Sequence, residues 1–170
     1  MECRDLTAEK KKEALMLISR YEIRLDNNRL PQMVKEASFS YAAEQLMSPE
    51  VMVDMLNSCF YLSDMAEEHV YVISLTSKMK PLAVFDLSHG TVACAPVDAR
   101  EVFTRALLSG AAGIVLAHNH PSGDPAPSGA DIEACNKIVQ ASELMHLPVL
   151  DFIIVGDRCY YSFKDKGMIK

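Results

Sequence analysis

The chain has 170 residues, of which 49% are hydrophobic and 24% charged, a balance that fits one domain with a hydrophobic core and excludes a disordered chain. Its 17 basic and 23 acidic residues give a net charge of −6, which argues against non-specific binding to phosphate backbones. No apolar run is long enough to cross a membrane and residues 1–5 lack the character of a secretory signal, so we expect a soluble, cytoplasmic protein with no membrane partner. The five cysteines are odd in number and widely spaced, which predicts reduced thiols.

Residues 1–45 are predicted to form an extension of the domain that follows. Thr7 can cap a helix that continues to about Arg20 with a narrow apolar stripe. A turn is indicated at residues 26–28 by three polar turn formers in a row. Residues 30–41 are weakly patterned, and the pattern leaves open whether they form an arm across this domain or across a partner subunit. A homodimer is therefore also left open.

Residues 46–170 are predicted to form one α/β domain, because strand-like and helix-like stretches alternate along them. The patterns indicate helices that begin near Ser48, Asp98 and Ser128, an antiparallel hairpin of strands over 68–75 and 82–87, and further strands over 112–117, 149–155 and 159–163. Such an order gives a mixed β-sheet flanked by helices.

Two histidines follow the apolar strand over 112–117. In an extended chain, residues two apart point the same way with their Cα atoms roughly 6–7 Å apart, so the imidazoles of His118 and His120 can converge on one ion. Proline, glycine and aspartate residues then make the chain turn, and a helix begins at Ser128. Asp131 lies in the first turn of that helix, which returns a carboxylate towards the histidines.

Two imidazoles and one carboxylate are the ligand set of a catalytic zinc site, which keeps a fourth position for water. A structural zinc site would need a fourth side chain, and no cysteine lies within this stretch. The plainer alternative is that Ser128 and Asp131 form only a capping box at the start of a helix. The two preceding histidines favour a zinc site on His118, His120 and Asp131.

A zinc-dependent hydrolase also needs a group that takes a proton from water and passes it to the leaving amine. Glu67 and Glu68 are the candidates, at the start of a predicted strand. Adjacent residues on a strand face opposite sides, so only one of them can face the metal. The residue pattern alone leaves this choice open.

The stretch from His118 to Pro125, with Ser128, Asp131 and an upstream glutamate, resembles the JAMM motif of the MPN/JAB metalloproteases. Within that family the chain is most similar to the bacterial RadC branch. The resemblance covers about residues 46–170 and continues through the following segments: Glu68-His69, residues 88–91, Arg100-Glu101, Leu150-Asp151 and residues 162–164.

The resemblance implies an MPN fold, which is similar to the cytidine deaminase sandwich, with Zn²⁺ on His118, His120 and Asp131. It implies that Glu68 is the catalytic glutamate and that Ser128 donates to the oxyanion. The implied reaction is hydrolysis of an amide or isopeptide bond in a peptide or protein substrate.

The chain departs from the family pattern at several positions. Family members commonly carry histidine at the position of Phe152 and proline at that of Ala99, neither of which is a metal ligand. A leading helix-hairpin-helix segment is common in RadC-like chains, and nothing before Ser48 has its glycine-punctuated hairpins, so DNA binding of that kind is not expected.

Two other functions are alternatives to a peptidase. A nucleobase-directed zinc hydrolase fits the similar fold, but such deaminases use His-x-Glu and Pro-Cys-x-x-Cys, which this chain lacks. A DNA-repair accessory or interaction module would use the metal only to shape a surface. The remaining polar side chains are expected to be turn, packing or surface residues: His69, His89, His146 and Asp124. For Asp124, a supporting role beside the metal is left open.

Overall fold

The computed structural model describes residues 15–90 and 97–169. Over these residues the elements in chain order are β1 (Leu15–Leu25), β2 (Pro31–Ala42), α1 (Pro49–Phe60), the short 3₁₀ helix η1 (Leu62–Asp64), β3 (His69–Leu75), β4 (Pro81–His89), α2 (Ala99–Leu108), β5 (Gly113–Asn119), α3 (Gly129–Met145), β6 (Val149–Val155) and β7 (Tyr160–Ser162).

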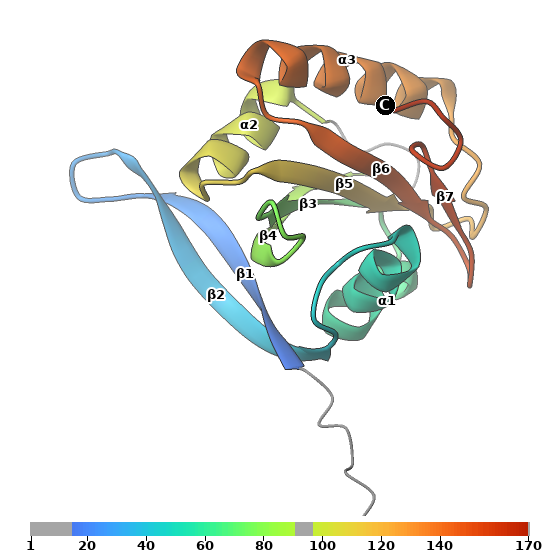
Figure 1. The fold of residues 1–170 in the computed structure, drawn as a ribbon, viewed down its shortest axis with the longest axis horizontal. Coiled ribbons are helices and arrows are strands. Elements are labelled where there is room, and N and C mark those ends of the chain that lie inside the picture. Colours follow the sequence, from blue (N-terminus) through green and yellow to red (C-terminus); the bar gives the residue numbers. More distant parts are fainter. Residues whose placement is uncertain (1–14, 91–96, 170) are drawn as a thin grey trace, which may run out of the picture.

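The strands form one mixed sheet in the order β2-β1-β4-β3-β5-β6-β7. Hairpins β1–β2 and β3–β4 are antiparallel, whereas β5 and β6 are parallel and connected by α3. Figure 1 shows α1 on one side of the sheet and α2 with α3 on the other. The expected fold class, a mixed α/β sheet flanked by helices in a single domain, is confirmed.

The two faces of the sheet bury separate hydrophobic cores, and alternation along β3 shows how. Tyr71 and Ile73 pack in the core beneath α1, and Val72 packs in the core beneath α2 and α3. Strand β5 is buried throughout, because both of its faces are covered. The site described below lies at the carboxyl end of this central strand.

The helix predicted from Thr7 to about Arg20 is wrong from Leu15 onward, where the structure has strand β1; its first part falls outside the described residues. Met16 and Ile18 point into the core beneath α1, whereas Tyr21 packs against the core on the other face. This is the alternation of a strand. Pairing with β2 along its whole length outweighs the weak local preference for a helix.

The stretch over residues 30–41, for which the sequence left two arrangements open, is β2 of the same chain and pairs with β1. The Tyr41 hydroxyl donates to Asp54 at 2.7 Å and so joins β2 to α1. Residues 15–42 therefore extend the central sheet. Among the helices of the described ranges, none has the length and apolar character needed to cross a bilayer.

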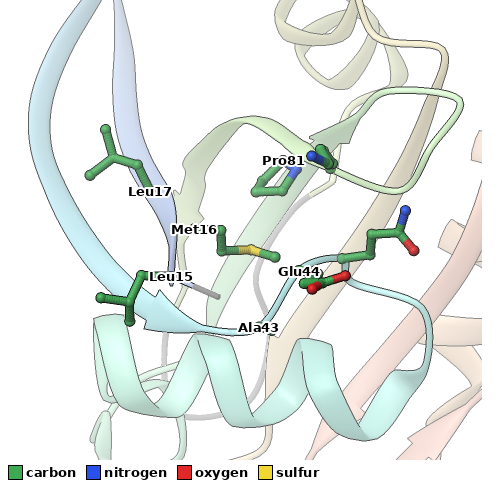
Figure 2. A pocket seen from close by; sticks show the side chains of 8 residues that line it. Leu15, Met16, Leu17, Ala43, Glu44 and Pro81 are labelled. Carbon is green, nitrogen blue, oxygen red and sulfur yellow. The ribbon is translucent and has the colours of Figure 1, made fainter. Parts of the chain in front are cut away.

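A hollow of about 480 Å³ lies beside the start of β1, between residues 15–17, residues 43–45 and Pro81. Figure 2 shows the Met16 side chain lying between β1 and the Ala43–Glu44 segment, with Leu15 and Leu17 directed away from it. Leu15 and Leu17 are 70% and 58% exposed, so this end of the hairpin carries apolar surface.

The elements predicted beyond residue 46 agree with the structure within a few residues. The two strands after η1 form the expected antiparallel hairpin, and the buried strand, the long helix and the last two strands are present. At α1 the side chain of Ser48 makes no capping hydrogen bond, so proline and the acidic Glu50 in the first turn mark this helix start. At α2, Asp98 caps by accepting from the Arg100 backbone N–H.

Candidate metal centre

The two histidines of the predicted site end β5 and follow it directly. His118 is 3% exposed within the strand, and the His120 backbone N–H donates to the Val155 carbonyl at 2.9 Å, which keeps this residue alongside β6. His118 pairs with Ile154 in the parallel ladder. The backbone of both residues is thus fixed by the buried centre of the sheet.

Asp131 reaches the histidines from the first turn of α3. The Nε2 atoms of His118 and His120 lie 3.1 Å apart, and each faces a carboxylate oxygen of Asp131, at 3.3 Å for His118 and 3.5 Å for His120. The structure therefore brings together the three side chains that the sequence predicts as ligands.

These separations fit a metal ion. A tetrahedral ion with bonds of 2.0–2.1 Å has ligand atoms about 3.3–3.4 Å apart. The two Nε2 atoms are separated by a similar distance, 3.1 Å, and the histidines approach Asp131 at 3.3 Å on Oδ1 and 3.5 Å on Oδ2. Two imidazole nitrogens and a carboxylate are donors that suit zinc and neighbouring transition metals. A capping box without any metal would not require two imidazole Nε2 atoms to face each other.

Hydrogen bonds around the cluster prepare two of the ligands. His120 Nδ1 lies 2.8 Å from the Asp124 carbonyl oxygen, to which it can only donate, so its Nε2 is left as a lone-pair donor. Burial alone would raise the pKa of Asp131, but hydrogen bonds from His118 and Ser128 outweigh burial and hold it well below its ordinary value. Asp131 is therefore a carboxylate at neutral pH.

The strand register places the two candidate glutamates on opposite faces of the sheet. Val70 pairs with His118 and shares its face of the sheet, and Gly90 donates to the Glu68 carbonyl at 2.8 Å, so the ladder continues one residue before β3. Glu68, two residues before Val70, therefore lies on the face of His118, whereas the exposed Glu67 lies on the other.

Asn119 fixes the backbone that carries these glutamates, a role that the sequence did not indicate. Its side-chain oxygen accepts from the His69 backbone N–H at 2.8 Å, and its amide donates to the carbonyls of Met65 and Glu67 at 3.2 Å and 3.0 Å. Asn119 is 1% exposed. The sequence signal that could have indicated this role is its position between the two histidines, because strand alternation directs the Asn119 side chain to the opposite face of the sheet.

A model of the RadC-like JAB domain matches residues 46–168, which is more than half of the chain. The chain belongs to the RadC-like JAB domain family. The match includes every residue of the cluster described above.

Relatives of this RadC-like chain include UPF0758 proteins from several bacteria. That of Alkaliphilus metalliredigens is 42% identical over 103 residues, which are 61% of this chain and 44% of the relative. That of Clostridium acetobutylicum is 35% identical over 130 residues (76% and 56%), and that of Pasteurella multocida 34% over 142 residues (81% and 63%). The chain therefore spans about half the length of these relatives.

Phe152, a position at which the family resemblance leads one to expect histidine, places an aromatic ring beside His118. Its ring centroid lies 5.5 Å from that of His118 and 5.2 Å from that of Phe163. Among the described residues, His118 Nδ1 has no hydrogen-bond partner. The His118 ring is therefore held by packing, by its buried strand and by the contacts of Nε2, whereas the His120 ring is also fixed through Nδ1.

Ser128, which the resemblance predicts to be an oxyanion donor, hydrogen-bonds to Asp131 in the structure. Its hydroxyl donates to the Asp131 carboxylate at 2.6 Å and accepts from the Asp131 backbone N–H at 3.2 Å, which completes a capping box. The single hydroxyl hydrogen thus points at a ligand. Donation to a substrate oxygen requires that hydrogen to turn away from Asp131.

The RadC-like loop between the histidines and α3 packs closely on the turn after β6. Gly123 has a φ of +82° and donates from its N–H to the His120 carbonyl, while its own carbonyl accepts from the Asp157 N–H at 2.9 Å. A Cβ on Gly156 would lie 2.9 Å from Pro125 Cδ and closer still to the Gly123 carbonyl oxygen. Glycine at 156 therefore lets the loop approach closely enough for Asp124 to orient His120.

Proposed function

We propose that this protein is a metal-dependent hydrolase of the JAMM type that cleaves a peptide or isopeptide bond, with zinc as the metal. The observation that carries the proposal is the convergence of His118, His120 and Asp131 at separations that suit one ion. Membership of the RadC-like JAB family supports the reaction class.

In the proposed mechanism His118, His120 and Asp131 hold the ion. When bound, such an ion supplies Lewis acidity, which polarises a carbonyl group and lowers the pKa of water. Asp131 contributes negative charge, and the Asp124 carbonyl keeps the His120 ring in the tautomer that can ligate.

Glu68 is proposed as the general base and then the general acid. It takes a proton from the attacking water and returns that proton to the leaving nitrogen, a transfer that contributes typically 10²–10⁴-fold to rate. Its half-buried position on the face of His118 supports this role. Glu67 is its matched control, since it is the same residue type one position away on the opposite face.

Ser128 is proposed to have two roles. In the resting site it orients Asp131, as its hydrogen bonds indicate. During the reaction its hydroxyl turns to donate to the oxygen that gains negative charge, which would stabilise the tetrahedral state.

The experiment compares Glu68→Gln with Glu67→Gln, using zinc-loaded protein and libraries of peptides and isopeptide-linked peptides. We expect Glu68→Gln to lower turnover by about 10²-fold or more while it keeps its zinc, because the carboxamide cannot accept the proton. Glu67→Gln should retain the activity of the unaltered protein. Equal activity of both variants would contradict the assignment of Glu68.

An accessory module that uses the metal only to shape a surface predicts another outcome. Such a protein would bind zinc but cleave no member of either library at any zinc concentration. A preference of the zinc-loaded protein for single-stranded DNA in a parallel binding assay would favour that alternative.

A further inference from the structure

A second cluster of potential metal ligands lies at the ends of β3 and β4. His69 Nδ1 is 3.3 Å from Asp86 Oδ2, and His89 Nε2 is 2.9 Å from the same oxygen. The two imidazole rings face each other with centroids 4.4 Å apart. One ligand atom from each of the three residues lies within 4.8 Å of the others.

This cluster faces the opposite side of the sheet from His118. His69 and Tyr71 alternate on the same face of β3, and Tyr71 packs in the core beneath α1. Asp86 pairs with Tyr71, and His89 pairs with His69, so both share that face. Glu68, the neighbour of His69 in sequence, points the other way. The two clusters are therefore separate sites, divided by the sheet.

The Asp86 carboxylate is largely buried, and Tyr71, which interacts with both Asp86 and Arg20, lies beside it in addition to the two histidines. The Asp86 side chain is 19% exposed, and its buried Oδ1 has no hydrogen-bond partner within residues 15–90 and 97–169. Arg20, on the same face of the sheet, directs its Nε to Glu36 at 3.3 Å. Burying a carboxylate costs free energy unless it is paired with a cation or bound to a metal.

Hydrogen bonds alone explain the cluster less well than a bound cation does. If both imidazoles only donate to Asp86, they share one carboxylate oxygen, and the distance of 3.3 Å for His69 is long for such a bond. Two imidazoles and a carboxylate with open positions form a common ligand set for divalent transition metals. His89 is 61% exposed, so a cation can reach the cluster from solvent.

We infer that His69, Asp86 and His89 form a second binding site for a divalent transition-metal ion such as Zn²⁺, which ties the end of β3 to the end of β4. The ion would bind Asp86 through Oδ2, balance the charge of its carboxylate and fix His69. Because His69 follows Glu68 directly, occupancy of this site also restrains the backbone that carries Glu68. The inference stands on its own geometry and does not depend on peptidase activity.

The test is a zinc titration of the 170-residue chain by calorimetry, with metal content measured after dialysis. The unaltered protein should bind about two zinc ions per chain, and His89→Gln and His120→Ala about one each, because each variant loses one ligand of a three-residue site. The double variant should bind none. His146→Gln is the matched control, since it removes an exposed imidazole outside both clusters, and should still bind two.

The variants separate the two sites. Zinc should raise the Tm of His120→Ala but not that of the double variant, because binding stabilises only a folded protein that retains a site. Should His89→Gln fail to fold by circular dichroism, Asp86→Asn, which nearly preserves shape, replaces it. The inference is overturned if His120→Ala binds no zinc, or if both substitutions in the second cluster leave stoichiometry unchanged. If the unaltered protein binds one zinc ion, and His89→Gln loses that ion while His120→Ala keeps it, the second site is supported and the proposed catalytic site is refuted.

Discussion

Replacing Ser128 with alanine tests how the start of α3 prepares a metal ligand. The hydroxyl makes two hydrogen bonds to Asp131, one to its carboxylate at 2.6 Å and one from its backbone N–H at 3.2 Å. The backbone N–H of Ser128 donates to the same carboxylate at 2.7 Å and survives the substitution. The variant therefore loses a helix cap and one of the two Ser128 bonds that orient Asp131.

Two magnitudes follow from this geometry. Loss of the N-cap costs about 1 kcal/mol in the free energy of unfolding, which for a chain of this size lowers the Tm by roughly 2–4 °C. Loss of a hydrogen bond that orients a metal ligand lowers metal affinity about 10–100-fold. Both effects should appear together in Ser128→Ala.

The assay combines urea denaturation of the metal-free protein with competition for zinc against a chelator. Asp98→Ala is the matched control, because Asp98 caps α2 through the Arg100 N–H and belongs to neither metal cluster. It should lose similar stability and keep the zinc affinity of the unaltered protein. Equal zinc affinities for the Ser128 and Asp98 variants would refute the reasoning.

Three further substitutions have expected outcomes. Asn119→Ala should lower turnover more than zinc affinity in activity assays, because it frees the backbone beside Glu68. In urea denaturation it should lower the free energy of unfolding by about 1–3 kcal/mol, because it leaves buried backbone groups unpaired. Gly156→Ala should weaken zinc binding in the chelator assay, whereas Gly129→Ala, whose Cβ meets nothing within 4 Å, should not. Burial raises the pKa of Asp151 and outweighs the hydrogen bonds that it accepts, which lower it. The contribution of Asp151 to the free energy of unfolding is therefore complete below the ordinary aspartate pKa of about 4 and is lost as pH rises through the raised pKa. Asp151→Asn should remove this part of the pH dependence of unfolding.

The convergence of His118, His120 and Asp131 could be predicted from sequence because it depends on local rules. His118 and His120 share a face by strand alternation, and Ser128 with Asp131 starts a helix by capping chemistry. The turn between them contains prolines, which restrict the backbone, and Gly123, which allows a positive φ. Each of these signals acts over a few residues.

Features that depend on strand pairing could not be read in the same way. Which of Glu67 and Glu68 shares the face of His118 depends on the register of β3 against β5, some fifty residues later in the chain. The nature of β1 depends on its pairing with β2 and β4, which outweighs its helical pattern. The cluster of His69, Asp86 and His89 likewise arises from pairing and an irregularity between β3 and β4, so the three residues have no recognisable spacing.

The central claim is that His118, His120 and Asp131 hold one ion with a position left for solvent. Its most direct test is anomalous diffraction at the zinc absorption edge from a crystal of the zinc-loaded protein. The account predicts a peak within bonding distance, about 2.0–2.2 Å, of both Nε2 atoms and the Asp131 carboxylate, with no fourth protein ligand. Absence of that peak at full zinc loading, or a fourth side chain that closes the coordination sphere, would contradict the account.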